Sequence, residues 1–267
     1  MQDSILEFNQ IKISFSNSVA VDNVSFSLKS GEILGLVGES GSGKSTIIKS
    51  IMAILNDDGK IESGEILFNG ENLLDKSEKE LQRIRGSRIG MIFQDSAASL
   101  CPIRTIGDQV IESMATQGKI DKKKAKEQAL KLFEKLNFKD PNSLWNSYPF
   151  ELSGGMNQRV GIAIAMINNP TLLLADEPTS ALDTNATSQV IEELKRIRND
   201  LGTSIIIVTH DMNVVEQVAD NIMVLKDGKV MEYGAKSQIL LNPQNEYTKM
   251  LLEAVPKPRS NGWNLSL

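Results

Sequence analysis

The first residues with a recognisable chemistry form a glycine-rich run, GESGSGKS at 38–45, which matches the pattern G-x-x-x-x-G-K-[ST] in full. Its glycines let the backbone curl so that successive N–H groups point at phosphate oxygens. Lys44 would neutralise the outer phosphates of a nucleoside triphosphate, and the Ser45 hydroxyl would bind Mg²⁺. The residues that we expect to contact the phosphates are Gly38, Ser40, Gly41, Gly43, Lys44, Ser45 and Thr46.

Two adjacent acids, Asp176 and Glu177, follow the apolar run TLLLA at 171–175. A carboxylate at the end of a buried strand is placed to face phosphates that bind beside that strand. We expect Asp176 to hold Mg²⁺, usually through water, because this ion gives up its hydration shell reluctantly. Glu177 would face an attacking water molecule, either as a general base or as the group that orients this water. Together with the glycine-rich run, the two acids indicate transfer of a phosphoryl group to water.

Short runs that are apolar on both faces alternate with helical patterns along the chain. The runs typical of buried parallel strands are 32–37, 88–93, 171–175 and 204–208. One helical stripe of apolar residues begins after Gly43 and continues to Leu55, and another spans 190–201 and ends before Gly202. This alternation predicts an α/β fold with a mainly parallel sheet.

Three regions depart from this alternation. Residues 1–30 and 61–74 are short β-branched or alternating stretches broken by Gly and Asn, which predicts an antiparallel β region attached to the parallel core. The stretch from about 96 to 168 is mostly helical in pattern. From Val255 onward, Pro and Ser predict a loosely ordered tail.

The composition of the 267-residue chain is that of an ordinary globular protein, with 40% hydrophobic and 24% charged residues. Its net charge of −5 does not favour a general electrostatic hold on DNA or on an anionic membrane. No stretch approaches the roughly 20 consecutive apolar residues that span a bilayer, and the first residues lack a signal-peptide pattern. A single cysteine, Cys101, cannot close a disulfide within the chain. We therefore expect a cytosolic protein that reaches a membrane only through a partner.

A further run, LSGGM at 152–156, is followed by NQR. With the motifs above, it resembles the LSGGQ signature of the nucleotide-binding subunits of ATP-binding cassette (ABC) transporters, and the resemblance covers roughly residues 3–255. It implies a P-loop NTPase (RecA-like) core with a mainly parallel sheet, an antiparallel β subdomain and an inserted helical subdomain. It also implies that Ser153, Gly154 and Gly155 lie at a helix N-terminus and reach the γ-phosphate of ATP held by the other subunit of a head-to-tail dimer.

Four other positions match the family pattern in order. Phe15 resembles the aromatic residue that stacks on adenine, with a core strand residue as the alternative, and Gln94 resembles the glutamine that senses the metal and the attacking water. Asp183 ends the run SALD, which resembles the loop that crosses the dimer interface. His210, the single histidine of the chain, resembles the switch histidine that contacts the γ-phosphate. The implied catalytic residues are Lys44, Gln94, Glu177 and His210, and the implied metal ligands are Ser45, Gln94 and Asp176.

Within the family, three segments look closest to the ATPases of peptide and nickel importers: 93–110, 148–160 and 245–256. Met156 replaces the final Gln of the signature, a replacement that is common in that group. Phe150 stands where those importers often have His, and Asn157 where they often have Arg. Many members also carry a cysteine cluster for an iron–sulfur centre. With Cys101 alone, four-thiolate ligation within this chain is impossible.

The resemblance implies an ABC ATPase domain over residues 1–255. Its core lobe would comprise 1–95 and 169–235, and its helical subdomain 96–168. Residues 236–267 would add a C-terminal helix and the loosely ordered tail.

The function that the resemblance implies is ATP hydrolysis, with Mg²⁺, that energises an importer for peptides, nickel or a metal chelate. The expected partners are membrane permease subunits, a second ATPase subunit that is identical or homologous, and indirectly an extracellular or periplasmic substrate-binding protein, with no nucleic acid. The expected location is the cytoplasmic face of the cell membrane, through the permease.

Three alternatives remain open. The first is a soluble ABC ATPase acting on ribosomes or DNA, which the single phosphate loop and the lack of sustained heptads disfavour. The second is an exporter subunit, which the importer-like segments disfavour. The third is a nucleotide-binding regulator without turnover, which the presence of Lys44, Asp176, Glu177 and His210 disfavours.

Overall fold

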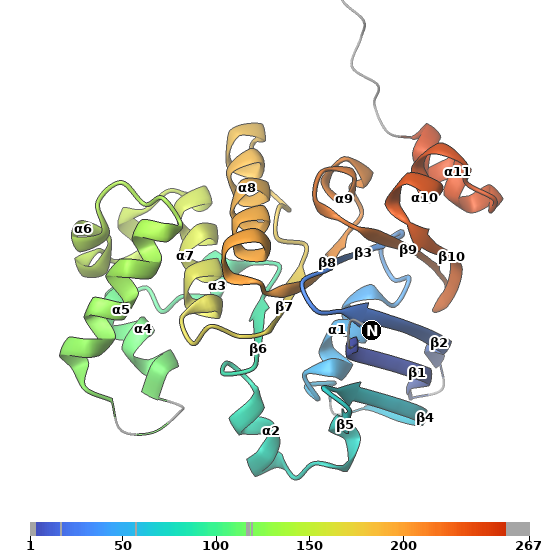
Figure 1. Ribbon diagram of the computed structural model, residues 1–267, viewed down its shortest axis with the longest axis horizontal. Helices are drawn as coiled ribbons and strands as arrows, with labels where there is room; N and C mark the ends of the chain where they lie inside the picture. The colour runs from blue at the N-terminus through green and yellow to red at the C-terminus, as the bar shows by residue number, and fades with distance from the viewer. Residues whose placement is uncertain (1–3, 17, 57, 116–117, 119, 255–267) are drawn as a thin grey trace, which may run out of the picture.

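The computed structural model describes residues 4–16, 18–56, 58–115, 118 and 120–254. In that part of the chain the strands form two sheets, one of six strands in the order β10-β9-β3-β8-β7-β6 and one of four in the order β2-β1-β4-β5. A group of helices, α3 to α7, lies at one end of the molecule, on the left of Figure 1, and the four-stranded sheet lies at the lower right.

The six-stranded sheet is built of β3 (Ile33–Val37), β6 (Ile89–Ile92), β7 (Leu172–Asp176), β8 (Ser204–Thr209), β9 (Asn221–Lys226) and β10 (Lys229–Ala235). Its neighbours pair in parallel except β9 and β10. Every residue of β3, β7 and β8 is buried, which is why these strands read as continuous apolar runs. The predicted α/β fold with a mainly parallel sheet is confirmed.

The four-stranded sheet is built of β1 (Ser4–Phe15), β2 (Ser18–Lys29), β4 (Gly59–Phe68) and β5 (Glu71–Asn72). All of its strand pairs are antiparallel, as predicted for residues 1–30 and 61–74. Alternate residues of β1 and β2 are buried because one face of the sheet packs on the core and the other faces outward.

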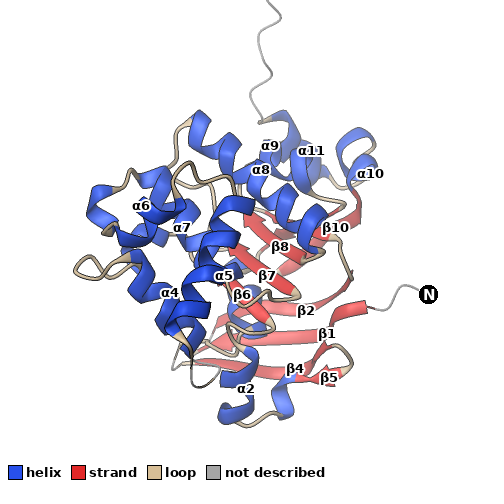
Figure 2. Cartoon of the chain, turned by 60° about the vertical axis from the view of Figure 1, so that its left-hand side comes forward, coloured by secondary structure: helices blue, strands red, loops and turns tan. Residues whose placement is uncertain are grey.

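The two faces of the parallel sheet pack against different partners, since successive side chains of a strand point to opposite faces. Leu34 and Leu36 of β3 join a core shared with the four-stranded sheet, to which Phe8 contributes a fully buried ring. Ile33 and Val37 join the other core, which is shared with the helices. Figure 2, turned by 60°, shows the helices gathered mainly on one side of the strands.

Helices α1 (Lys44–Ile51), α8 (Thr184–Leu201) and α9 (Met212–Val218) follow the strands β3, β7 and β8 of the six-stranded sheet. Helix α1 ends about one turn before Leu55, where the apolar stripe had predicted its end. Asp183 caps α8 by accepting a hydrogen bond from the Ala186 N–H at 2.8 Å. Gly202 ends α8 in the left-handed conformation, with φ of 69°, as predicted from its position.

The stretch from about 96 to 168 is mostly helical, as predicted. Its helices are α3 (Ser96–Ser99), α4 (Ile106–Ala115), α5 (Lys122–Lys135), α6 (Pro141–Asn146), η2 (Pro149–Glu151) and α7 (Gly154–Met166). Before it, η1 (Leu73–Asp75) and α2 (Glu78–Ile84) lie between β5 and β6. Helices α4 and α6 approach closely at Gly107, where an added Cβ would lie 2.4 Å from the Trp145 ring. This close contact holds α6, and with it the segment that leads into α7.

The C-terminal part of the described chain differs from the prediction of one helix. Two helices, α10 (Lys236–Leu241) and α11 (Glu246–Glu253), stand there instead. Pro243 lies between them, and proline cannot continue a helix because it lacks the N–H and clashes with the preceding turn. The tail predicted from Val255 lies outside the described residues, and the domain boundaries remain predictions.

In the described part of the chain, no helix has the length and apolar content that crossing a membrane requires.

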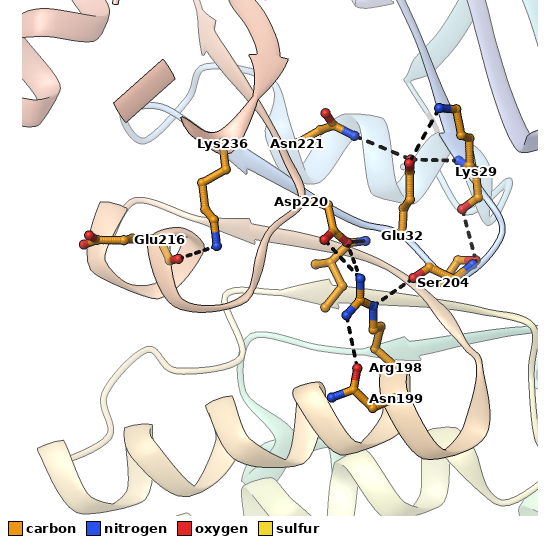
Figure 3. Close-up of polar contacts among 11 residues, drawn as sticks. Lys29, Glu32, Arg198, Asn199, Ser204, Glu216, Asp220, Asn221 and Lys236 are labelled. Atoms are coloured by element: carbon orange, nitrogen blue, oxygen red, sulfur yellow. Dashed lines mark hydrogen bonds and ion pairs between the residues drawn. The ribbon is translucent and has the colours of Figure 1, made fainter. Parts of the chain in front are cut away.

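A polar cluster ties the amino ends of β3 and β9 to α8 (Figure 3). Arg198 of α8 contacts the Asp220 carboxylate at 3.1 Å and donates to the Gly31 carbonyl at 3.0 Å. The same carboxylate accepts the Ile33 N–H at 2.9 Å. These contacts hold the start of β3 in place, so that the loop after its carboxyl end leaves from a fixed strand.

Candidate active site

The glycine-rich run leads directly from β3 into α1. Gly41 and Gly43 have φ of 81° and 100°, a left-handed conformation that favours glycine. A side chain at Gly43 would place its Cβ 2.6 Å from the Ala20 carbonyl oxygen, and one at Gly38 would place it 2.1 Å from that of Leu225. The backbone therefore curls tightly against β2 and β9, with room for glycine alone at these positions.

The Lys44 side chain folds back into this loop. Its Nζ donates to the Gly38 and Glu39 carbonyl oxygens, at 2.7 Å each, and to the Ser42 hydroxyl at 3.3 Å. Burial lowers the pKa of Lys44, and the carboxylates of Glu177 and Asp176 oppose this shift. An ammonium group has three hydrogen-bond donors, so all three point at acceptors within the loop. A phosphate oxygen would replace one or more of these acceptors.

Ser45 and Asp176 form a direct contact between α1 and the end of β7. The Ser45 hydroxyl donates to Oδ1 of Asp176 at 2.8 Å. Burial raises the pKa of Asp176, and the hydrogen bond from Ser45 opposes this shift. A hydroxyl and a carboxylate are hard oxygen donors, the kind that Mg²⁺ prefers, so the pair fits a magnesium ion.

Glu177 and His210 face each other across neighbouring strand ends. His210 Nδ1 lies 3.3 Å from Oε2 of Glu177. Glu177 has φ of 46°, which is left-handed and costly for a residue with a Cβ, and its N–H is held by the Val208 carbonyl at 2.8 Å. Strained backbone of this kind concentrates at functional sites, where it aims a side chain.

Strand order explains why these residues meet. Strands β3, β8 and β7 are adjacent and parallel, so their carboxyl ends share one edge of the sheet. Lys44 follows β3, Asp176 and Glu177 follow β7, and His210 follows β8. Ligands of open α/β sheets bind outside the carboxyl ends of the strands, which is where these side chains converge.

The signature run forms a second group of residues. Ser153 caps α7 by accepting the Met156 N–H at 3.3 Å. A hollow of about 300 Å³ is lined by Ser153, Gly154, Gly155 and Asp183 among others. No residue of the loop 38–45 lines this hollow in the described part of the chain. The chain thus brings its predicted site residues together in two separate places.

The remaining predicted site residues lie at the edges of these two groups. Gln94 is exposed two residues beyond β6, and its carbonyl oxygen accepts the Ser180 hydroxyl at 3.4 Å, which links it to the loop before Asp183. Phe15 ends β1 opposite Gly59, partly buried against the core. Ser40 is exposed in the glycine-rich loop, and Thr46 lies half-buried in the first turn of α1.

Two contacts of the loop were missed in the sequence. Ser42 accepts from Lys44, and its carbonyl accepts the Gly228 N–H at 3.1 Å. The Glu39 N–H donates to the Tyr247 hydroxyl at 3.2 Å, although the two residues are 208 positions apart. Ser42 lies inside the glycine-rich motif, whereas no local pattern in the sequence marks Tyr247.

Comparison with known proteins decides the family. A family model described as ABC transporter matches residues 21–180, more than half of the chain. The chain belongs to the ABC transporter family.

Two solved ABC cassettes share its fold. A dimeric cassette bound to ADP and Pi superposes with a TM-score of 0.75 at 30% identity, covering 86% of this chain and 98% of the other. The structure of cbiO1 from Clostridium perfringens gives a TM-score of 0.79 at 28% identity, covering 90% and 92%.

Two curated relatives match nearly the whole ABC chain. The oligopeptide transport ATP-binding protein OppD of Bacillus subtilis (strain 168) is 43% identical over 263 residues, covering 97% of this chain and 74% of the relative. The dipeptide transport ATP-binding protein DppD of the same strain is 41% identical over 269 residues, covering 99% and 80%. The protein is an ATPase component of a transporter.

Proposed function

We propose that this ABC ATPase powers the import of peptides. The observation that supports ATP hydrolysis is a convergence of side chains at one edge of the sheet. These are Lys44, the Ser45–Asp176 pair and the Glu177–His210 pair. The names of the relatives, an oligopeptide and a dipeptide transport ATP-binding protein, support peptides as the cargo rather than nickel or a metal chelate.

In the proposed mechanism the protein acts by position and charge. Lys44 binds the outer phosphates and balances their charge, and Glu177 accepts the proton of the attacking water through its carboxylate. His210 holds that carboxylate in one orientation from Nδ1, and its exposed ring would be free to contact the nucleotide. Ser45 and Asp176 would hold Mg²⁺, which when bound offsets the negative charge of the phosphates.

We propose that a second ATPase subunit completes each site. Ser153 and Gly154 lie at the N-terminus of α7, where free N–H groups and the helix dipole favour an anion. A Cβ at Gly154 would meet nothing within 4 Å, so this surface is open to a partner. Because the signature lines a hollow apart from the phosphate loop, it would serve nucleotide bound by a second copy or a homologous subunit, in a head-to-tail dimer.

We further propose that the helical region faces a membrane permease on the cytoplasmic side, with a substrate-binding protein acting on the far side. A groove of about 380 Å³ beside β6 is lined by Phe93, Leu100 and Gln109 among others. Next to it, Ile103 is 83% exposed. Gln109 holds the loop that carries Ile103, because its side chain accepts the Cys101 N–H at 2.8 Å and donates to the Arg104 carbonyl at 3.1 Å. A rigid loop with an exposed apolar tip is suited to docking.

Uptake measurements test the proposal. In cells that lack the chromosomal gene, we expect the wild-type chain to restore accumulation of radiolabelled di- to pentapeptides, and Glu177→Gln not to. Restored uptake of ⁶³Ni²⁺ without peptide uptake would overturn the proposal that the cargo is a peptide. Ile103→Asp should abolish peptide uptake while the isolated chain keeps its ATPase activity. Leu241→Asp, which alters a similarly exposed apolar side chain on α10, is the matched control.

A further inference from the structure

The C-terminal helix α11 contacts the phosphate loop through one side chain. Tyr247 is 7% exposed, and its hydroxyl accepts the N–H of Glu39 at 3.2 Å. This contact is made to the backbone of the loop. The Glu39 side chain also interacts with the Tyr247 hydroxyl, and burial and this side chain together raise the pKa of Tyr247.

This N–H belongs to the same peptide unit as the Gly38 carbonyl, which accepts from Lys44 Nζ at 2.7 Å. In a trans peptide the C=O and N–H bonds point in opposite directions and rotate together. Lys44 and Tyr247 therefore form hydrogen bonds with opposite edges of the same peptide group. If this peptide group turned, the Gly38 carbonyl would leave Lys44, and the direction in which the ammonium group points would change.

Tyr247 is itself held on several sides. The Lys226 ammonium lies 4.6 Å from the centroid of its ring, and Asn245 accepts its N–H at 2.9 Å as the cap of α11. Asn245 also donates to the Met231 carbonyl of β10 at 3.2 Å, and the Glu232 carboxylate accepts the N–H groups of Gln244 and Asn245 at 2.8 and 3.2 Å. The hydroxyl thus has a fixed position relative to β10.

We propose that Tyr247 is a positioning residue for nucleotide binding: its hydroxyl holds the Gly38–Glu39 peptide in the orientation that places Lys44 for the phosphates. The proposal rests on nucleotide binding by the loop and is independent of the cargo. A loop that is already oriented loses less conformational freedom when nucleotide binds. Orienting the loop therefore increases its affinity for nucleotide. Burial raises the pKa of Tyr247, which favours the protonated hydroxyl.

The test compares Tyr247→Phe with Tyr233→Phe in the full chain. Tyr233 offers a matched control, because its hydroxyl donates to the Ser27 carbonyl at 3.1 Å and makes no contact with residues 38–45 in the described structure. ADP with Mg²⁺ is the probe, titrated by calorimetry, since ADP is not consumed and occupies the phosphate loop. Lys44→Ala shows in the same assay whether the loop binds the nucleotide at all.

For Tyr247→Phe we expect the Kd for ADP and the KM for ATP to rise about 3- to 10-fold with kcat unchanged, because the loop is then less well oriented before the nucleotide binds. Tyr233→Phe should keep the wild-type Kd. Amide hydrogen exchange read by NMR should speed up at Glu39 in Tyr247→Phe alone. Asn245→Ala, which frees α11 from β10, should raise the Kd in the same direction.

An ADP affinity of Tyr247→Phe equal to that of the wild type would overturn the proposal, as would an equal loss in both tyrosine variants. Unchanged exchange of the Glu39 amide would also overturn it, since the hydroxyl would then not be holding this peptide. If Lys44→Ala bound ADP as tightly as the wild type, the assignment of the phosphate site itself would fail, and that failure is distinct from the failure of Tyr247.

Discussion

His210 Nδ1 lies 3.3 Å from Oε2 of Glu177, and the two side chains differ in exposure, 65% for His210 and 19% for Glu177. The glutamate is the enclosed partner and the histidine covers it from the solvent side. This relationship joins two strand ends, after β7 and after β8, and it supports the proposal that the two residues act as one catalytic unit.

Glu177→Gln should slow ATP hydrolysis by about 10²- to 10⁴-fold, because the amide cannot accept the proton of the attacking water. Binding of ADP should stay at the wild-type level, since Gln keeps the shape of the side chain. Phosphate release at saturating ATP gives the rate, and calorimetry gives the affinity. Glu216→Gln, at an exposed position of α9, is the control and should hydrolyse ATP normally. Normal turnover by Glu177→Gln would remove Glu177 as the base.

His210→Ala should lower kcat by about 10- to 100-fold, because the base loses the group that orients it. When two residues act as one unit, their effects are not additive. The double variant His210→Ala with Glu177→Gln should therefore hydrolyse ATP no more slowly than Glu177→Gln alone. Rates that multiply in the double variant would mean that the two residues act independently.

Lys44→Ala should weaken nucleotide binding itself by about 10- to 100-fold, because the phosphates lose a charge-assisted contact inside a buried loop. Lys44→Ala is therefore recognised by a changed affinity for ADP, whereas Glu177→Gln changes only the rate of ATP hydrolysis. Lys131→Ala removes an exposed charge from α5 and should bind ADP as the wild type does. Equal ADP affinities for Lys44→Ala and the wild type would contradict the assignment.

Glu193 predicts a pH dependence of stability. It lies on α8 with 1% of its side chain exposed, contacts Arg159 of α7 through Oε1, and leaves Oε2 without a partner among the described residues. Burial raises its pKa from 4.5 to about 7, and the charge of Arg159 opposes this shift. Between these two values the folded state binds more protons than the unfolded state, so stability is lost as the pH rises through this window.

We therefore expect the free energy of unfolding to fall by on the order of 2 kcal/mol between pH 5 and pH 8 through this group. Urea titrations at the two pH values measure it. In Glu193→Gln this contribution disappears and the difference between the two pH values shrinks by that amount. Glu192→Gln, whose side chain is 56% exposed, should keep the wild-type difference. An unchanged difference in Glu193→Gln would show that this carboxyl does not titrate in the window.

Much of the fold followed from local signals. Buried strands showed as continuous apolar runs, and Gly202 marked the end of α8 because only glycine adopts the left-handed conformation there without cost. Helix α1 was placed correctly at its start but extended too far, since the apolar stripe continues to Leu55 after the helix has ended. Pro243, which divides the C-terminal helix in two, was a visible signal that the prediction overlooked.

The sequence by itself determined the chemistry of each motif: glycines that allow a curled loop, a lysine and a serine for phosphates and metal, two acids after a strand, and a serine–glycine helix start. Only the tertiary structure decided which of these motifs meet. The order of β3, β8 and β7 brings Lys44, Asp176 and His210 to one edge and leaves the signature in a hollow of its own. Contacts such as Tyr247 with Glu39 join residues far apart in the chain, and their partners are set by packing, which no local pattern records.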